Sequence, residues 1–204
     1  MIAAVMCGGK GSRMDNFRDI EKPLLEVKGK TMVERVLDAL VQSRDFDKIF
    51  GVISSNTPKT NVFVSYHLSW SKIDIIKTEG KSYSKDLSIV LNKLKTSIIF
   101  VIPADLPLLN PKIIHKIISR YTPGLPCVSI VSDKQFVVNM GIKPSLILNI
   151  NSKEYCHTGI TIVDSSKVEG FTTVKEYYVI MNEKEIVVNV NTRGELEIAE
   201  RLLG

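Results

Sequence analysis

Short apolar runs alternate with amphipathic stretches along the first part of the chain, and this alternation limits the folds that it can adopt. The apolar runs cover residues 2–6, 48–54, 73–78 and 97–102. The amphipathic stretches cover residues 31–42, about 58–68 and about 84–95. Runs of the first kind are typical of buried strands, and those of the second kind are typical of helices. The pattern predicts an α/β fold with a mostly parallel, twisted sheet and helices on both faces.

Four predicted helices begin at sequences that commonly cap a helix. Thr31-Met-Val-Glu34 has the spacing of a capping box. Thr57-Pro58 and Asn110-Pro111 each place a capping residue before a first-turn proline. Thr192-Arg-Gly-Glu195 repeats the capping-box spacing before a helix that we expect to end at Leu203.

From residue 123 onwards the alternation is looser. Strand-like pieces occupy residues 126–131, 136–142, 158–163, 176–180 and 185–190. We expect residues 1–122 to form a Rossmann-like half and residues 123–204 to complete the sheet and build one wall of a cleft. Residues 1–204 are thus predicted to be a single domain. Ligands of such sheets bind beyond the carboxyl ends of the strands, so the loops there are the candidate sites.

Composition argues against several classes of protein. The net charge of +5 comes from 27 basic and 22 acidic residues spread along the chain, which argues against a nucleic-acid partner. No apolar run is long enough to span a membrane, and Met1–Met6 is too short for a signal-peptide core, so we expect a cytoplasmic protein. The three cysteines lack CxxC spacing, which argues against disulfides, and we expect Cys156-His157 to pack rather than bind zinc.

The first predicted strand runs into a glycine-rich, basic loop, Cys7–Arg13. The loop holds Gly8, Gly9, Gly11 and Ser12 together with Lys10 and Arg13. It has neither the GxGxxG nor the GxxxxGK[ST] spacing. Its glycines can let backbone N–H groups approach phosphate oxygens, and its basic side chains can neutralise their charge. The alternative is a glycine turn with solvated basic residues.

Two further residues are candidates for phosphate chemistry. Lys22 precedes Pro23, which restricts the backbone, and could act as a point charge beside a phosphate. Asp105 follows the fourth apolar run and could supply an oxygen ligand to Mg²⁺. The alternatives are a solvated lysine and an aspartate that caps the helix beginning near Pro111.

Together these segments resemble a family. GGKGSRM, Lys22 and Ala104-Asp105-Leu106-Pro107 are similar to the GGxxxRM…K…DxP signature of nucleotidyltransferases that join an NTP to a phosphorylated acceptor. Further segments resemble archaeal adenosylcobinamide-phosphate guanylyltransferases, of the MobA-like NTP transferase superfamily. They are residues 54–60, residues 78–87, Thr158-Gly159-Ile160 and the stretch from Asn189 to Leu196. Cys7 departs from the family's usual alanine, and the stretch from Met14 to Lys22 is longer than usual, so Lys10 is the alternative phosphate lysine.

The resemblance implies a three-layer αβα fold of the nucleotide-diphospho-sugar transferase type. It also implies transfer of GMP from GTP to adenosylcobinamide phosphate with release of pyrophosphate. In that reaction Asp105 would hold Mg²⁺ and Lys22 would stabilise charge on the α-phosphate. Arg13 and Lys10, with the amides of Gly8, Gly9, Gly11 and Ser12, would hold the pyrophosphate. The resemblance calls for no general base, and we expect the three histidines to be surface or packing residues.

Base and acceptor recognition are assigned to other strand ends. The family match places nucleotide contacts at Asn56, and its neighbours Thr57, Thr78, Glu79 and Gly80 could read guanine or ribose. Asn56 and Thr57 could instead cap a helix. Gly159 and Asn191 are candidates for the acceptor side, although Gly159 could be a turn glycine.

Three alternatives remain open. The acceptor could be molybdopterin, a phospholactate or a sugar or polyol phosphate. The chain could also be a non-catalytic nucleotide-binding module, or, with less support, a basic nucleic-acid binder. No apolar helix stripe is left over from the predicted core faces, so the sequence leaves a homodimer open.

Overall fold

The computed structural model describes residues 1–8, 20–66, 72–95, 97–168 and 174–204. Within these ranges, one eight-stranded sheet has the order β10-β7-β9-β6-β1-β4-β5, and β8 pairs with β9 beside it. Its strands are β1 (Ile2–Met6), β4 (Lys48–Ser54), β5 (Ile73–Thr78), β6 (Ile98–Pro103), β7 (Cys127–Asp133), β8 (Ile147–Ile150), β9 (Lys153–Asp164) and β10 (Glu176–Ile180). The sheet contains strands from both parts of the chain.

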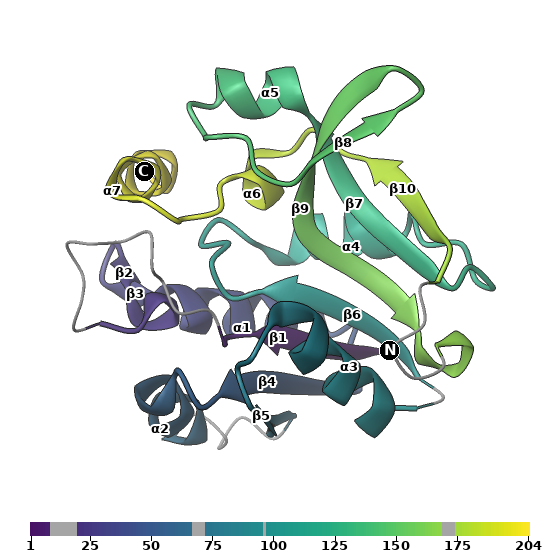
Figure 1. The fold of residues 1–204 in the computed structure, drawn as a ribbon. Helices are drawn as coiled ribbons and strands as arrows, with labels where there is room; N and C mark the ends of the chain where they lie inside the picture. Colours follow the sequence, from purple (N-terminus) through teal and green to yellow (C-terminus); the bar gives the residue numbers. More distant parts are fainter. Residues whose placement is uncertain (9–19, 67–71, 96, 169–173) are drawn as a thin grey trace.

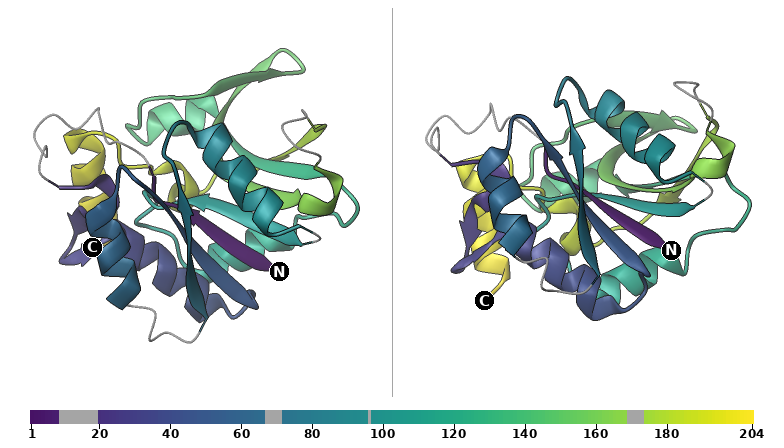
Figure 2. Two further views of the ribbon diagram at one scale, coloured as in Figure 1. Left: turned by 60° about the horizontal axis from the view of Figure 1, so that its bottom comes forward. Right: turned by 90° about the horizontal axis from the view of Figure 1, so that it is seen from below.

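The sheet is mostly parallel. β1 lies between β4 and β6 and is parallel to both, β4 is parallel to β5, and β10 is parallel to β7. β9 is antiparallel to β6, β7 and β8. Because β9 runs against its neighbours, the parallel strands on either side of it end at one edge of the sheet. The strands fan out with the usual twist (Figure 2).

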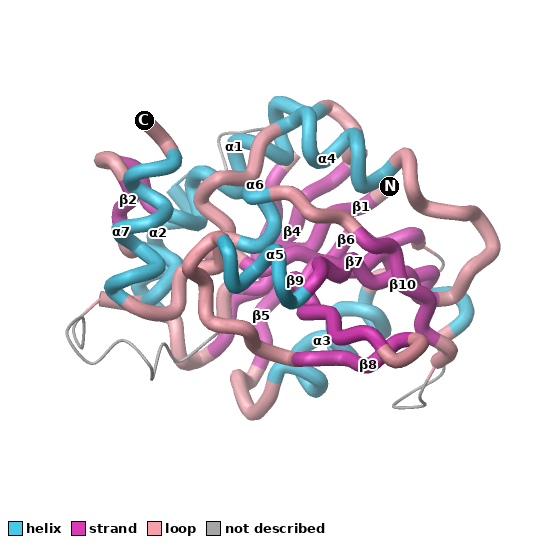
Figure 3. Tube along the Cα trace, turned by 90° about the horizontal axis from the view of Figure 1, so that it is seen from above, coloured by secondary structure: helices cyan, strands magenta, loops and turns pink. Residues whose placement is uncertain are grey.

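Helices cover both faces, as predicted. β1 alternates between the faces: Ala3 and Val5 join one core cluster and Ala4 the other. The first cluster includes residues of α1 (Met32–Ser43), α2 (Pro58–Tyr66) and α4 (Pro111–Ile118). The second includes Val90 and Leu91 of α3 (Tyr83–Lys93). Figure 3 shows α1 and α4 on one side of the strands and α3 on the other.

Two predicted strands are wrong. Residues 136–142 begin inside helix α5 (Lys134–Asn139), and residues 185–190 begin in the single turn α6 (Lys184–Val187). Both elements bury apolar side chains in the first core cluster, Val137 from α5 and Ile186 and Val187 from α6. Short apolar runs do not distinguish a strand from a buried helical turn, and here tertiary packing decides. Helix α7 (Arg193–Leu202) completes the chain (Figure 1).

Smaller elements join these parts. They are the 3₁₀ turns η2 (Lys22–Leu24) and η4 (Ser165–Lys167) and the antiparallel pair β2 (Glu26–Val27) and β3 (Lys30–Thr31). Among the described residues, no helix is long and apolar enough to cross a membrane.

Three of the four predicted caps are confirmed. Thr31 Oγ1 accepts from Glu34 N, Asn110 Oδ1 from Ile113 N and Thr192 Oγ1 from Glu195 N. At α2 the cap differs, because the Glu21 carboxylate accepts from Lys59 N at 2.7 Å and Thr60 N at 2.6 Å. The Thr57 hydroxyl instead donates to Ser54 O at 3.3 Å.

Candidate functional site

A cleft of about 720 Å³ lies at the edge of the sheet where the parallel strands end. Three groups of residues line it. One group follows β1 and β5 and includes Gly8, Gly80 and Asp86. A second is polar and includes Lys22, Asp105, Asn189 and Asn191. The third comes from β9 and the loop before β8 and includes Leu146, His157 and Gly159.

The polar group is joined by hydrogen bonds around Asp105. Lys22 Nζ contacts Asp105 Oδ2 and donates to Asn191 Oδ1 at 2.8 Å. Asn189 Nδ2 donates to the other carboxylate oxygen, Oδ1, at 2.9 Å. The side chains of Lys22 and Asp105 are only 12% and 16% exposed, so this ion pair is held in the cleft and is not a solvated surface pair. The structure thus brings together the predicted residues Lys22, Asp105 and Asn191.

Lys22 is positioned by the residues on either side of it. Glu21 binds the first turn of α2 through its carboxylate, and Thr60 Oγ1 also donates to it at 2.6 Å. A carboxylate at this end of a helix is favoured because the N-terminal N–H groups are unpaired and the helix dipole is positive there. Pro23 is buried within η2. The lysine therefore lies on a short turn anchored at both ends.

The two asparagines lie in the segment before α7. Asn189 donates to Asp105, Asn191 accepts from Lys22, and Asn191 Nδ2 contacts Asn189 Oδ1, so both side chains meet at the Lys22–Asp105 pair. Between them, Val190 N donates to Asp105 O at 3.1 Å. The buried Glu195 accepts from Asn191 N at 2.7 Å, so the start of α7 fixes the segment.

Gly8 and Gly80 meet at a narrow place beside Ser54. Ser54 Oγ donates to Gly8 O at 3.1 Å, and Asn56 Nδ2 donates to Gly80 O at 2.9 Å. Gly80 N donates to Asp86 Oδ1 at 3.1 Å. Gly80 has φ +69°, and a Cβ there would lie 2.3 Å from Asn56 Nδ2. Only glycine fits this turn.

Four predicted nucleotide contacts, Asn56, Thr57, Thr78 and Glu79, are not among the residues that line the cleft. Thr57 is buried, and Thr78 Oγ1 donates to Ile53 O at 3.4 Å. Glu79 is exposed and pairs with Lys81. Gly9, Lys10, Gly11, Ser12 and Arg13 lie outside the described residues.

Gly159 lies where β9 passes the end of β6. It has φ +85°, and a Cβ there would lie 3.0 Å from Pro103 Cγ. Its N–H donates to His157 Nδ1 at 2.8 Å. The neighbouring Cys156 is buried, and burial raises the pKa of its thiol. Cys156 thus packs in the core, and His157 Nδ1 is occupied by the Gly159 N–H.

Cys7 fills a small buried place next to the cleft. Its Sγ donates to Val5 O at 3.4 Å, and its side chain is almost fully covered. Burial, reinforced by the Asp105 charge, raises the pKa of this thiol far above its usual range. The side chain remains an uncharged thiol that takes the space of a small apolar residue.

The donor set fits one bound Mg²⁺ shared with phosphates. Among the described residues, no three His, Cys, Asp or Glu side chains come together as a metal site. Asp105 is the one carboxylate within the polar group described above. Mg²⁺ is commonly held by one or two carboxylates plus phosphate and water oxygens, so a single aspartate in a cleft is sufficient on the protein side.

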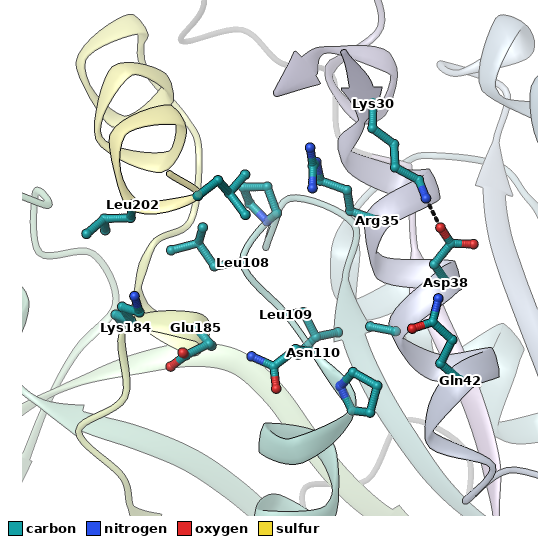
Figure 4. A pocket seen from close by; sticks show the side chains of 14 residues that line it. Lys30, Arg35, Asp38, Gln42, Leu108, Leu109, Asn110, Lys184, Glu185 and Leu202 are labelled. Atoms are coloured by element: carbon teal, nitrogen blue, oxygen red, sulfur yellow. Dashed lines mark hydrogen bonds and ion pairs between the residues drawn. The ribbon is translucent and has the colours of Figure 1, made fainter. Parts of the chain in front are cut away.

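A second hollow of about 370 Å³ lies between α1, α7 and the loop before α4. It shares no lining residue with the cleft. Three of its charged groups already have partners: Lys30 pairs with Asp38 (Figure 4), and Arg35 Nε donates to Val27 O at 2.9 Å. Among the described residues, this hollow has no hydrogen-bonded group of polar side chains like the one around Asp105.

The sequence patterns did not identify several residues of the site. They are Glu21, Ser54, Asp86, His157, Asn189 and Glu195. The i, i+2 spacing of Asn189 and Asn191 could have indicated the first of these two as well. No local signal indicates that Glu21 caps α2 or that His157 binds Gly159 N–H.

Comparisons with known proteins agree with this geometry. A family model described as MobA-like NTP transferase domain matches residues 3–160. The chain is 31% identical to the adenosylcobinamide-phosphate guanylyltransferase of Methanocaldococcus jannaschii, over 100% of this chain and 97% of the relative. It is 24% identical to a probable molybdenum cofactor guanylyltransferase of Natranaerobius thermophilus, over 99% and 96% of the two chains.

Solved structures show the fold. The 4-diphosphocytidyl-2C-methyl-D-erythritol synthase of Anaerococcus prevotii superposes with a TM-score of 0.69 at 14% identity, over 99% of this chain and 95% of that one. A transferase structure from Thermus thermophilus gives the same TM-score at 15% identity, over 96% and 98%. The predicted α/β architecture of the nucleotide-diphospho-sugar transferase type is confirmed.

Proposed function

This chain belongs to the family of MobA-like NTP transferase domains, and we propose that it transfers GMP from GTP to adenosylcobinamide phosphate and releases pyrophosphate. The observation that carries the proposal is the Lys22–Asp105 pair, held by two asparagines in a cleft at the ends of the parallel strands. The full-length similarity to an adenosylcobinamide-phosphate guanylyltransferase supports the choice of acceptor and of GTP.

The reaction is an in-line displacement at phosphorus. An oxygen of the acceptor phosphate forms a bond to the α-phosphorus of GTP, and the bond from that phosphorus to the bridging β-phosphate oxygen breaks. The nucleophile is already ionised, so the chain needs no general base. What it must supply is orientation and compensation of charge.

Lys22 and Asp105 would divide that work. Two of the three N–H donors of Lys22 go to Asp105 and Asn191, and we assign the third to an α-phosphate oxygen. Asp105 would hold Mg²⁺, which would supply positive charge to the phosphate oxygens when bound. Asn189 and Asn191 hold the carboxylate and the ammonium in place. Arg13 and Lys10, with the loop amides of Gly8, Gly9, Gly11 and Ser12, are proposed to bind the leaving pyrophosphate.

The guanine is proposed to bind beside the loops that follow β4 and β5. Asn56 uses Nδ2 to hold Gly80 O, and its Oδ1 is the atom we assign to the nucleotide. Thr57, Thr78 and Glu79 support these loops through contacts of their own. Leaving such polar groups unpaired would penalise a wrong base by about 1–3 kcal/mol per group.

A pyrophosphate-release assay tests the proposal. The chain with Mg²⁺ is given each of four NTPs and, separately, adenosylcobinamide phosphate, molybdopterin, a phospholactate and a sugar phosphate. We expect release only with GTP and adenosylcobinamide phosphate. Release with GTP and molybdopterin alone would instead support the second candidate, which the Natranaerobius thermophilus relative favours. GTP binding without release for any acceptor would indicate a non-catalytic nucleotide-binding module.

A further inference from the structure

Strand β9 carries an irregularity at the cleft. Between the pairs Ser129↔Thr161 and Val131↔His157, one residue of β7 faces three residues of β9, so β9 bulges by two residues. Gly159 is the middle residue of the bulge and lies against Pro103, at the end of the strand that leads to Asp105. Bulges next to active sites commonly reorient the chain there. This bulge therefore shapes the cleft close to the reacting centre.

The bulge is held by its own side chains. Thr158 Oγ1 donates to Ile130 O at 2.8 Å and accepts from Ile160 N at 3.2 Å. His157 Nδ1 accepts from Gly159 N at 2.8 Å. The Gly159 N–H is not paired with β7 and needs another hydrogen-bond partner, which the imidazole of His157 supplies. An accepting Nδ1 places the proton of the neutral ring on Nε2.

The other side of the imidazole faces a second polar group. His157 Nε2 lies 3.6 Å from Glu176 Oε1. Glu176 is itself held, because Tyr178 OH donates to its Oε2 at 2.8 Å and Ser129 Oγ contacts its Oε1. Burial lowers the pKa of His157, and the Glu176 charge opposes that change. The ring is thus oriented from strands β7, β9 and β10 together.

The side of the cleft on which His157 lies indicates which substrate it serves. His157, Gly159 and Leu146 line the cleft from the β9 side, and His157 N donates to Leu146 O at 3.1 Å. Gly8 and Gly80, which we assign to the nucleotide, form a separate group with Asp86, because Ser54 Oγ donates to Gly8 O and Gly80 N donates to Asp86. The β9 side is left for the second substrate.

We propose that His157 is a positioning residue for the phosphorylated acceptor, because its Nδ1 holds the Gly159 bulge that forms the acceptor side of the cleft. This inference rests on the proposed transfer to an acceptor phosphate. It assigns a role to a side chain that the displacement itself does not use. The inference requires that the bulge is maintained by an atom at the δ position of residue 157 that accepts the hydrogen bond from Gly159 N. The imidazole ring as such is not required.

Two substitutions separate the effect of the hydrogen-bond-accepting δ atom from the effect of the imidazole ring. In His157→Asn, the side-chain Oδ1 lies close to the place of Nδ1 and can accept the N–H two residues on, as in an Asx-turn. In His157→Gln, the side-chain amide reaches the place of Nε2, and no atom at the δ position can accept a hydrogen bond from Gly159 N. Initial rates with varied adenosylcobinamide phosphate and varied GTP give the two KM values, and amide exchange of Gly159 without substrate reports the hydrogen bond.

We expect His157→Gln to raise the acceptor KM by about tenfold or more while the GTP KM changes by less than about twofold. His157→Asn should stay within about threefold of the unaltered chain for both KM values, and Gly159 exchange should be faster in His157→Gln only. An unchanged acceptor KM in His157→Gln, or an equal rise of both KM values, would overturn the inference. Equal Gly159 exchange in all three proteins would also overturn it. If the unaltered chain releases no pyrophosphate with any acceptor, the proposed function fails and the acceptor role fails with it.

Discussion

Asp105 is the residue on which the proposed chemistry depends most. It accepts hydrogen bonds from Lys22 and Asn189, and its backbone carbonyl accepts from Val190 N. One residue therefore links the end of β6, the turn that carries Lys22 and the segment before α7. A carboxylate held in this way is preorganised, and little reorganisation is needed when charge develops during transfer.

Substitution Asp105→Asn tests this charge. The amide keeps the shape of the side chain but removes the negative charge that pairs with Lys22 and that would bind Mg²⁺. We expect kcat for pyrophosphate release to fall by about 100- to 1,000-fold, a size typical of losing one preorganised electrostatic group. Asp74→Asn, at an exposed carboxylate that pairs with Lys48, is the matched control and should leave kcat unchanged. A near-normal rate in Asp105→Asn would contradict the proposed role.

Gly80 is the residue whose backbone restricts the side of the cleft that we propose for the nucleotide. Its positive φ and its approach to Asn56 make two separate demands, and substitution to alanine can measure them. Gly124 has φ +92°, and among the described residues no atom lies within 4 Å of the place that a Cβ would take there. Gly124→Ala therefore introduces only the backbone strain.

We expect Gly80→Ala to lower the free energy of unfolding by about 2–3 kcal/mol and Gly124→Ala by about 1 kcal/mol. Urea denaturation measures both. Because the clash pushes Asn56 and Ser54 away from residue 80, Gly80→Ala should also raise the KM for GTP, which Gly124→Ala should not do. Equal effects of the two substitutions would show that the contact with Asn56 is unimportant.

At the scale of elements, one carboxylate joins α2 to the turn that carries Lys22. Glu21 caps the helix, and the next residue is Lys22. The pairing links the stability of α2 to the position of the lysine. It also explains why α2 can begin at a proline whose preceding threonine hydroxyl donates elsewhere.

Substitution Glu21→Gln should weaken both functions of this carboxylate. Loss of the charge at the helix N-terminus should cost about 1 kcal/mol, which lowers the Tm of a chain of this size by about 2–4 °C. The kcat should also fall, because Lys22 is held less firmly. The exposed Glu26, on β2, gives the control Glu26→Gln. A lower Tm with an unchanged kcat would show that Glu21 stabilises α2 without positioning Lys22.

At the scale of the whole molecule, the three cysteines report how tightly the core is closed. Cys7, Cys127 and Cys156 are all buried. Burial raises the pKa of each thiol, that of Cys127 to about 11. The thiolate is the reactive form, so both access and ionisation oppose reaction.

A thiol reagent such as Ellman's reagent at pH 8 should therefore label the folded chain very slowly. In a denaturing concentration of guanidinium, all three cysteines should react. The absorbance of the released thiolate measures both. Because the folded pKa values lie above the unfolded value of 9.0, the contribution of these thiols to stability is complete below that pH and is lost above it. Rapid labelling of the folded chain at pH 8 would contradict this closed core.

The amount that could be predicted differs between core and cleft. The strands at residues 2–6, 48–54 and 73–78 have the bounds expected from their apolar runs. β1 and β4 lie inside the sheet and are almost entirely buried, which requires apolar residues. β5 lies at the edge of the sheet and buries Ile73 and Ile76. The strands predicted at residues 136–142 and 185–190 were wrong, because a short apolar run fits a helical turn equally well. Lys22 and Asp105 were singled out because Lys22 precedes a proline, Asp105 follows a buried strand, and both match the family signature.

By itself, the sequence determined the fold class, the family resemblance, and the edge of the sheet at which the cleft with Lys22 and Asp105 lies. Those properties follow from periodicity and from local backbone chemistry, which neighbouring residues specify. Only the tertiary structure decided that Glu21 holds α2, that Asn189 shares Asp105 with Lys22, and that His157 holds the bulge at Gly159. Each of these contacts joins separate elements or depends on strand register, and register is set when the whole sheet packs.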